Sequence, residues 1–325
     1  MASAVTSTPL RHVLLTGANG FVGRAVGSAL GKSGHTVRAA VRNAVSNPNV
    51  YSDSVSVGEI DGNTDWSKSL VNVDVIIHLA ARVHVMREMA STPLASFRTV
   101  NVDGTLNLAR QAADAGVKRM IFLSSIKVNG ETTIGKQAFS EQDQVQPQND
   151  YALSKWEAEQ GLHKIAEDSG MAVTIIRPPL VYGPGVKGNF EALINIVKMG
   201  WPLPLASINN QRSLIGIDNL VDFIITCVHH SGAANETFLL KDGEDMSTPQ
   251  LIRRLAKITG KTPRLFPIPL KALQGLAIIA GKRDVMQRLC GDLQIDNHKA
   301  TYLLGWTPPI TVDEGLNRTV TAARK

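Results

Sequence analysis

A glycine-rich turn between an apolar strand and a helix constrains the fold of this chain more than any other feature. The run His12–Thr16 has strand character, the turn Gly17-Ala18-Asn19-Gly20-Phe21-Val22-Gly23 follows, and Phe21–Leu30 is predicted to be a helix ended by Gly31 and Gly34. Glycines allow the backbone to approach a pyrophosphate, and a helix N-terminus directs unpaired N–H groups at it. The turn therefore predicts a dinucleotide site. Its predicted contacts are Gly17, Asn19, Gly20, Phe21, Val22 and Gly23.

Strands and helices alternate through the first half of the chain. Beyond the first strand, five more are predicted at Val37–Val41, Val55–Val57, Val73–Leu79, Met120–Ser124 and Ala172–Arg177. This alternation predicts an α/β fold with a doubly wound parallel Rossmann sheet.

The second half is punctuated by proline and glycine. Residues 181–212 are predicted to be loops that reach over a pocket, whereas Leu214–Ile217 and Thr237–Leu240 are predicted to return to the main sheet or its edge. The predicted NAD(P)-binding Rossmann domain therefore takes residues 1–180 and about 214–245. A smaller, interleaved C-terminal substrate-binding region takes residues 181–213 and 246–325.

The stretch Tyr151-Ala-Leu-Ser-Lys155 places a phenol and an ammonium group four residues apart. On a helix these residues share a face, so Lys155 is expected to favour the phenolate and to lower the pKa of Tyr151 from about 10. Such a phenol can act as an acid or base near neutral pH. The spacing alone also suits a solvated helix face, but Tyr51, Tyr182 and Tyr302 lack the lysine partner.

Composition limits the function classes. A chain of 325 residues, 43% hydrophobic and 19% charged, can bury a large core. Its two cysteines, Cys227 and Cys290, cannot define a disulfide framework or a zinc site, which indicates a reducing cytoplasm and no metal centre. The first nine residues are predicted to be a frayed tail and not a signal peptide. The net charge of +6 suits an anionic cofactor and substrate, and nothing resembles a nucleic-acid-binding module.

One segment has a lipid-like composition. Leu270–Ala280 is strongly apolar but too short to span a bilayer, so no membrane span is expected. The segment is predicted to be a buried helix rather than a membrane-contacting one.

The glycine spacing Gly-x-x-Gly-x-x-Gly, followed by Leu123-Ser124-Ser125 and Tyr151-x-x-x-Lys155, resembles the extended short-chain dehydrogenase/reductase family in its nucleotide-sugar branch. The likeness runs nearly end to end. Further matching stretches are Ile77–Ala81, Asn101–Thr105, Arg177–Gly185, Arg212–Asp218 and Leu304–Pro309. The additional cofactor contacts that the resemblance implies are Glu59, Ile60, Leu79, Ala80, Ala81 and Pro178.

In the family's mechanism a hydride moves between a nicotinamide and a sugar carbon while the tyrosine carries the proton. The resemblance gives this role to Tyr151, and Lys155 is expected to lower its pKa and bind the nicotinamide ribose. Ser125 is expected to hydrogen-bond the reacting oxygen. It is preferred to Ser124 because it lies three residues before Val128, as in the family's pattern.

Dehydratases of the family carry an Asp-Glu pair just after the catalytic hydroxyl residue, and Ile126 and Lys127 take those positions here. Isoleucine cannot transfer a proton and lysine has the wrong charge, so dehydration is disfavoured. Lys127 is kept as a possible substrate contact, with a solvated lysine as the alternative.

The end of the second predicted strand bears on the choice of cofactor. NAD-preferring members carry an acidic residue there, whereas a nearby arginine suits a 2′-phosphate. Here Val41 takes the acid's place and Arg42 follows. NADP(H) is therefore predicted, with Arg42 binding the extra phosphate, and NAD(H) remains the alternative.

This cofactor prediction favours reduction, because 4-epimerases of the family retain NAD within one turnover. Ala81–Met86, Ser124–Gly130 and Asp242–Asp245 are similar to reductases that convert UDP-4-keto-6-deoxy-N-acetylglucosamine to UDP-N-acetylquinovosamine. We therefore expect NADPH-dependent reduction of the 4-keto group of a UDP-linked 4-keto-6-deoxy-hexosamine in bacterial polysaccharide synthesis, with Tyr151 as proton donor.

Two other functions remain open. One is 4-epimerisation of a UDP-hexose or of a polyprenyl-diphosphate-linked N-acetylhexosamine, and the other is a non-catalytic NADP-binding sensor or interaction protein. The presence of Ser125, Tyr151 and Lys155 together argues against the sensor, because binding alone needs no proton carrier.

Substrate contacts are implied at Asn189, Arg212 and Arg288. Arg212 matches the family arginine that binds the diphosphate, Asn189 the position that meets diphosphate or sugar, and Arg288 lies in a changed form of the family's Arg-x-Gly-Asp pattern. Each residue also suits a plain surface hydrogen bond. Helices around 93–115 and 151–167 resemble the family's dimer interface, so a homodimer is expected.

Overall fold

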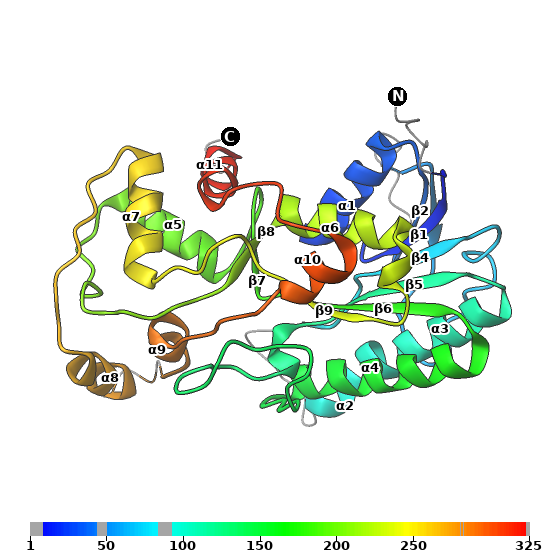
Figure 1. Cartoon of the computed structure of the whole chain (residues 1–325), viewed down its shortest axis with the longest axis horizontal. Coiled ribbons are helices and arrows are strands. Elements are labelled where there is room, and N and C mark those ends of the chain that lie inside the picture. The colour runs from blue at the N-terminus through cyan, green and yellow to red at the C-terminus, as the bar shows by residue number, and fades with distance from the viewer. Residues whose placement is uncertain (1–8, 44–50, 84–92, 280, 282, 323–325) are drawn as a thin grey trace. The chain divides into compact units, whose positions relative to one another are not determined.

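The computed structural model describes residues 9–43, 51–83, 93–279, 281 and 283–322. The chain divides into two compact units (Figure 1), of which the first comprises residues 1–128, 145–177 and 221–238. The second comprises residues 129–144, 178–220 and 239–325. These units are defined by packing, so the predicted extents of the cofactor-binding and substrate-binding regions stay predictions.

A seven-stranded sheet organises the first unit, in the order β3-β2-β1-β4-β5-β6-β9. From β3 to β6, every neighbouring pair of strands runs parallel. This confirms the predicted doubly wound Rossmann sheet. The strands are β1 (His12–Thr16), β2 (Thr36–Val41), β3 (Asp53–Ser56), β4 (Val75–His78), β5 (Arg119–Leu123), β6 (Ala172–Arg177) and β9 (Thr237–Leu239).

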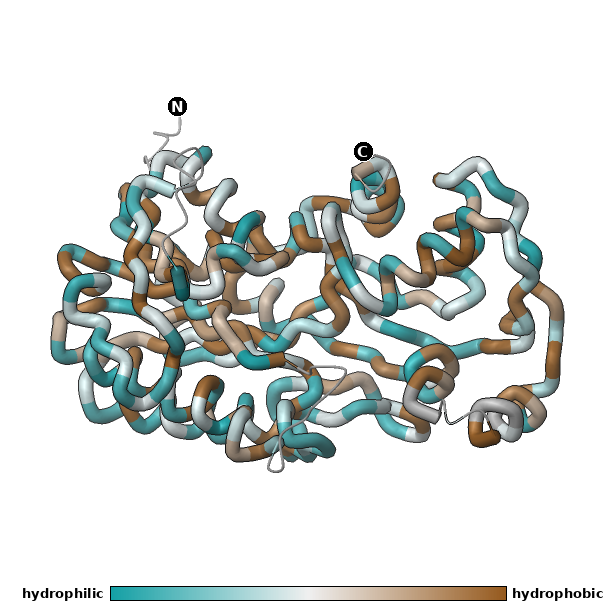
Figure 2. Tube along the Cα trace, turned by 180° about the vertical axis from the view of Figure 1, so that it is seen from behind, coloured by the Kyte–Doolittle hydropathy of each residue, from teal (hydrophilic) through white to brown (hydrophobic). Residues whose placement is uncertain are grey.

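Helices cover both faces of this sheet, with α3 and α4 below it and α1 and α6 above it in Figure 1. The central strands are mostly apolar and buried because both faces are covered, and Figure 2 shows many hydrophobic residues along the chain in this unit. Leu14, Ile76 and Phe122 from the strands form one core with Leu108 and Leu162 from α3 and α4. The helices are α1 (Phe21–Lys32), α2 (Pro93–Arg98), α3 (Thr105–Asp114), α4 (Asp150–Ser169) and α6 (Ile217–His229), whose first turn belongs to the second unit.

The second unit holds a two-stranded parallel sheet of β7 (Leu180–Tyr182) and β8 (Leu214–Gly216). The prediction that Thr237–Leu240 returns to the main sheet is confirmed by β9, but the same prediction for Leu214–Ile217 is wrong. An apolar pattern shows that a strand is buried and does not identify its partner. The helices of this unit are α5 (Asn189–Met199), α7 (Thr248–Thr259), α8 (Leu270–Ile279), α9 (Arg283–Cys290), α10 (His298–Leu304) and α11 (Val312–Ala322).

Helix α5 corrects the prediction that residues 181–212 form only loops. Phe190, Ile194 and Val197 follow one another at helical spacing and are all buried in the core of the second unit. The Pro and Gly residues on either side of α5 favoured a loop prediction, so the helical spacing of its apolar residues was not recognised.

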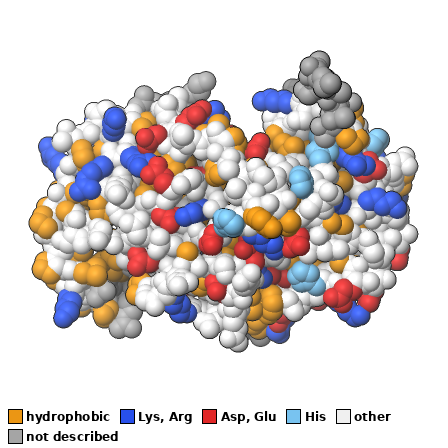
Figure 3. Space-filling view, viewed as in Figure 1, with side chains coloured by type: hydrophobic (Ala, Val, Ile, Leu, Met, Phe, Trp, Pro, Cys, Tyr) orange, Lys and Arg blue, Asp and Glu red, His pale blue; other side chains and the backbone are white. Residues whose placement is uncertain are grey.

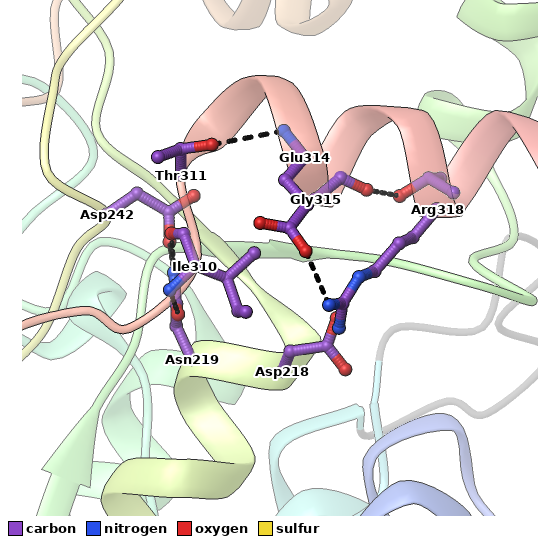
Figure 4. A network of polar contacts seen from close by, with 9 residues as sticks. Asp218, Asn219, Asp242, Ile310, Thr311, Glu314, Gly315 and Arg318 are labelled. Carbon is purple, nitrogen blue, oxygen red and sulfur yellow. Dashed lines mark hydrogen bonds and ion pairs between the residues drawn. The ribbon is translucent and has the colours of Figure 1, made fainter.

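A buried carboxylate fastens the second unit together. Asp242 accepts hydrogen bonds from the Tyr182 hydroxyl at 2.7 Å, from the Gly216 backbone at 2.9 Å and from Asn219 at 2.7 Å. Asn219 in turn exchanges two hydrogen bonds of 2.9 Å with the backbone of Ile310, next to α11 (Figure 4). The network therefore ties β7, β8 and the chain leading to α11 into one body.

Helix α8 is exposed, contrary to the prediction of a buried helix. Leu273 is buried, but Leu270, Ile278 and Ile279 face solvent, and Ala280 lies outside the described residues. Hydrophobic composition without a clear period does not separate a core helix from one that binds another surface. In the described part of the chain, no helix combines the length and apolarity that crossing a bilayer requires.

Candidate active site

The glycine turn after β1 fits closely against the end of β4. Gly17 has a φ of +66°, and a Cβ there would lie 2.7 Å from the backbone nitrogen of Ala80. A Cβ on Gly23 would lie 2.1 Å from the Gly17 oxygen, so α1 packs directly on the turn. Gly20 precedes α1 and no side chain caps the helix there. This backbone cradle, with free N–H groups at a helix N-terminus, fits the pyrophosphate of a dinucleotide.

The other predicted turn residues surround this cradle. Asn19 is exposed, whereas Phe21 and Val22 are partly buried in the first turn of α1. These positions agree with the predicted cofactor contacts, which stay predictions.

The end of β4 is positioned by a buried histidine that the sequence analysis did not single out. The Thr16 hydroxyl lies 2.7 Å from His78 Nδ1 and accepts from the backbone nitrogens of Leu79 and Ala80, both at 3.2 Å. His78 Nε2 lies 3.0 Å from the Thr105 hydroxyl. Burial and the charge of Lys155 lower the pKa of His78 to about 3, so this residue stays neutral. Its two ring nitrogens hydrogen-bond the hydroxyls of Thr16 and Thr105 and thereby fix the end of β4.

Tyr151 and Lys155 lie one turn apart at the start of α4. The helix is capped by Asn149, whose side chain accepts from the Ala152 nitrogen at 2.9 Å. Tyr151 is partly buried against Phe97, with ring centroids 6.2 Å apart. Lys155 is 1% exposed, and its Nζ lies 4.1 Å from the centre of the Phe122 ring.

The electrostatics of this pair differ from the sequence-based expectation. Burial raises the pKa of Tyr151 to about 12, and burial lowers the pKa of Lys155 to about 7 although the negative charge of Glu159 opposes this. The prediction that Lys155 brings the pKa of Tyr151 below its usual value is therefore wrong for the protein alone. The physical reason is that desolvation of the phenol dominates its pKa.

The two candidate serines have different surroundings. Ser124 is buried, and its hydroxyl donates to Glu159 Oε1. Ser125 is partly exposed at the end of β5, where its Oγ accepts from the Lys127 backbone at 3.3 Å. A hydroxyl that already donates to a buried carboxylate is poorly placed for substrate, so Ser125 stays the predicted contact of the reacting oxygen.

Glu159 lies one turn beyond Lys155 and is fully buried. It accepts from Arg177 Nε at 3.1 Å and from Arg177 Nη2 at 2.5 Å, in addition to Ser124. This ion pair joins α4 to β5 and β6 and holds the helix that carries Tyr151 and Lys155. Pro178 follows Arg177 directly, at the end of β6.

A π-helical turn, Thr99–Gly104, supplies a second support for α4. Asn101 in this turn is fully buried and bonds the backbone of Arg82 twice, at 2.8 and 3.0 Å. Its amide also donates to the Ser154 hydroxyl at 2.9 Å. Asn101 thereby links the segment after Ala81 to the turn between Tyr151 and Lys155. The sequence placed this stretch in the family's central helix but assigned Asn101 no role.

Beyond the ends of β2 and β3, Arg42 and Glu59 form an exposed ion pair of 3.6 Å. Both were predicted cofactor contacts, Arg42 for a 2′-phosphate and Glu59 for adenine. Ile60 packs against the core of the first unit, and a Cβ on Gly104 would lie 2.6 Å from its Cγ2. The phosphate of NADP would therefore have to compete with a carboxylate for Arg42.

The predicted substrate residues of the second unit fall into two places. Arg212 donates to the Gly291 oxygen at 2.9 Å. Burial lowers the pKa of Arg212, the negative charge of Asp292 opposes this, and the positive charge of Arg288 adds to the lowering. The carboxylate of Asp292 therefore already offsets part of the positive charge that an anionic diphosphate would meet at Arg212. Asn189 is exposed in the first turn of α5.

Comparisons with known proteins agree with this geometry. The family model described as the NAD dependent epimerase/dehydratase family matches residues 13–240. A Vibrio cholerae protein described as UDP-glucose 4-epimerase is 47% identical over 96% of this chain and 95% of its own length. An Escherichia coli O157:H7 protein described as N-acetyl-alpha-D-glucosaminyl-diphospho-ditrans,octacis-undecaprenol 4-epimerase is 28% identical over 95% of this chain and 94% of its own. The crystal structure of UDP-glucuronic acid 4-epimerase from Bacillus cereus in complex with NAD matches with a TM-score of 0.77 and 22% identity, over 96% of this chain and 98% of that one.

Proposed function

The chain belongs to the NAD-dependent epimerase/dehydratase family, in its nucleotide-sugar branch, and from this premise we propose that it is a UDP-hexose 4-epimerase. The observation that carries the proposal is the 47% identity, along nearly the whole of both chains, with a protein described as UDP-glucose 4-epimerase. A 4-epimerase is preferred to the reductase expected from the sequence, because neither of the two relatives named above is described as a reductase.

The side chains of the first unit suit the chemistry. A nicotinamide cofactor, when bound at the glycine turn, would supply a reversible hydride acceptor for C4 of the sugar. Tyr151 takes the proton of the C4 hydroxyl as the ketone forms and gives it back after the sugar has turned, while Ser125 hydrogen-bonds the reacting oxygen. Because the pKa of Tyr151 is raised to about 12 in the protein alone, the first step requires the positive charges of Lys155 and of the oxidised cofactor to favour its ionised form.

The reductase remains the second candidate on two observations. A phenol with a pKa of about 12 is protonated, which is the form that donates a proton to a ketone. In addition, β2 ends at Val41, where NAD-preferring members carry an acid, and Arg42 follows it. The subgroup stretch Asp242–Asp245 does not add to this, because Asp242 is a structural tie, Glu244 pairs with Arg254, and Asp245 accepts from Ser213.

A substrate assay separates the two candidates. We expect the purified protein to interconvert UDP-glucose and UDP-galactose, or the corresponding N-acetylhexosamine pair, without net consumption of NAD(P)H, as measured by proton NMR. The polyprenyl-diphosphate-linked N-acetylhexosamine is the next substrate to test, in view of the Escherichia coli relative. Stoichiometric NADPH oxidation with UDP-4-keto-6-deoxy-N-acetylglucosamine, without epimerisation of any UDP-hexose, would contradict the epimerase and establish the reductase.

A further inference from the structure

The exposed apolar helix α8 belongs to a larger surface of the second unit. Ile279 is 85% exposed, and Leu270 and Ile278 are exposed on the same helix. Phe266 is exposed just before α8, and the Trp201 side chain is 62% exposed. We call these five residues the α8 surface.

Backbone pairing joins the two segments that carry the aromatic residues. Leu203 donates to the Arg264 oxygen at 2.8 Å, and Phe266 donates to the Leu203 oxygen at 3.1 Å. Trp201 is two residues before Leu203 and therefore lies near the segment that leads into α8. Aromatic side chains with exposed aliphatic neighbours are typical of a surface that binds the boundary between water and lipid.

An excess of basic residues occurs in the stretch of sequence that contains α8. Residues 246–283 contain eight of the 34 basic residues and none of the 28 acidic ones, which leaves 26 basic against 28 acidic residues elsewhere. Of the eight, Arg254 pairs with Glu244, while Lys261, Arg264 and Lys271 are exposed around the start of α8. Three of the eight, Arg253, Arg254 and Lys257, belong to α7, so the basic residues beside the exposed apolar side chains of α8 are Lys261, Arg264 and Lys271. In Figure 3, hydrophobic and blue side chains gather together at the lower left, where Figure 1 shows α8.

We propose that the α8 surface binds an anionic lipid membrane as a peripheral contact. Apolar side chains that enter the headgroup region, combined with basic residues that attract anionic lipids, supply the two contributions that stable surface binding requires. A second copy of the chain is a poorer occupant, because a symmetric contact would place the same basic residues opposite one another. Nucleic acid would leave Ile278 and Ile279 in water.

Vesicle flotation with the full-length protein tests the proposal without any turnover. We expect binding to vesicles of phosphatidylcholine mixed with phosphatidylglycerol and weak binding to phosphatidylcholine alone, with the difference reduced by salt. The double variant Ile278→Asp, Ile279→Asp should lose vesicle binding, and Lys271→Gln should weaken it about fivefold, as expected for one basic residue near an anionic surface. Tryptophan emission should shift to the blue on binding, and Trp201→Phe should remove this shift.

Tyr302→Asp is the matched control, because Tyr302 is 81% exposed but lies on α10, outside the α8 surface. This variant should bind vesicles as the parent does, and all variants should keep their melting temperature and their activity on a water-soluble substrate. Equal binding to neutral and anionic vesicles, or unchanged binding of the Ile278→Asp, Ile279→Asp variant, would overturn the proposal. So would a halved mass of that variant in solution, because the surface would then join two copies of the chain.

Discussion

Two buried carboxylates, one in each unit, show how similar networks serve different purposes. Glu159 and Asp242 are both fully buried and each accepts several hydrogen bonds. Glu159 is paired with a cation, Arg177, whereas the bonds to Asp242 come from neutral groups, including Tyr182, and burial raises its pKa. Glu159 also lies one helical turn from Lys155, a second buried ionisable group, and its negative charge opposes the lowering of the Lys155 pKa by burial. Burial of a carboxylate does not by itself indicate a reaction site. Glu159 is connected with the candidate site because it lies next to Lys155, whereas no cation is among the described groups that bond Asp242.

The largest effect that separates the two units concerns their tyrosines. Tyr151→Phe should lower kcat by about 10³-fold or more, because the proton carrier is lost, and should leave the melting temperature nearly unchanged. Tyr182→Phe removes a fully buried hydroxyl that bonds Asp242, so it should lower the free energy of unfolding by about 1–3 kcal/mol and leave kcat within a few-fold. Steady-state kinetics and urea unfolding of both variants check this. Near-normal turnover by Tyr151→Phe would remove the proposed chemistry from α4.

The next effect compares the carboxylates themselves. Glu159→Gln leaves the Arg177 guanidinium buried without its counter-ion and should cost about 3–5 kcal/mol of stability. It should also shift the pH profile of kcat to lower pH, because Glu159 raises the pKa of Lys155. Asp242→Asn should lower stability with no shift in that profile. Equal pH profiles for the two variants would show that Glu159 acts only as a structural tie.

Sequence patterns predicted the parts of the molecule that depend on local chemistry. The turn at Gly17–Gly23 and the pair Tyr151 and Lys155 lie where their spacing placed them, since the backbone of a glycine turn and the pitch of a helix follow from a few residues. Asn101 and His78 escaped prediction because their roles depend on partners more than 20 residues away, Ser154 and Thr105. The same limit explains β8, whose partner strand could not be read from its own residues.

Solvation set another limit on prediction. The spacing of Tyr151 and Lys155 indicated how their charges would interact, but the depth at which both are buried comes from tertiary packing around Phe97 and Phe122. Burial reversed the expected direction of the tyrosine pKa. The exposure of α8 was missed for the same reason, because composition alone does not show which neighbours cover a helix.

The burial of Lys155 should itself be visible in the pH dependence of stability. Its pKa in the folded protein is lowered to about 7 from the usual value of 10.5, so between these values the unfolded chain binds a proton that the folded chain does not. Stability from this group therefore rises with pH from about 7 to 10.5, and below pH 7 the full cost of burying the charge remains. Lys155→Met should be more stable than the parent at pH 6, by up to roughly 4 kcal/mol. The difference should vanish near pH 10 in urea unfolding experiments, whereas a constant difference would mean that Lys155 keeps an ordinary pKa.

The smallest expected effect lies at the exposed end of the cofactor cradle, where the Arg42 and Glu59 side chains are 74% and 78% exposed. An ion pair this exposed contributes about 0–1 kcal/mol, so Arg42→Ala should leave stability unchanged. If Arg42 binds the 2′-phosphate, the variant should bind NADP about tenfold more weakly and NAD within about twofold of the parent. Glu59→Gln should strengthen NADP binding, because it removes the carboxylate that competes for the guanidinium. Fluorescence titration with both cofactors measures these affinities. Equal losses for NAD and NADP in Arg42→Ala would remove the one cofactor argument for a reductase and leave the epimerase as the better account of the site.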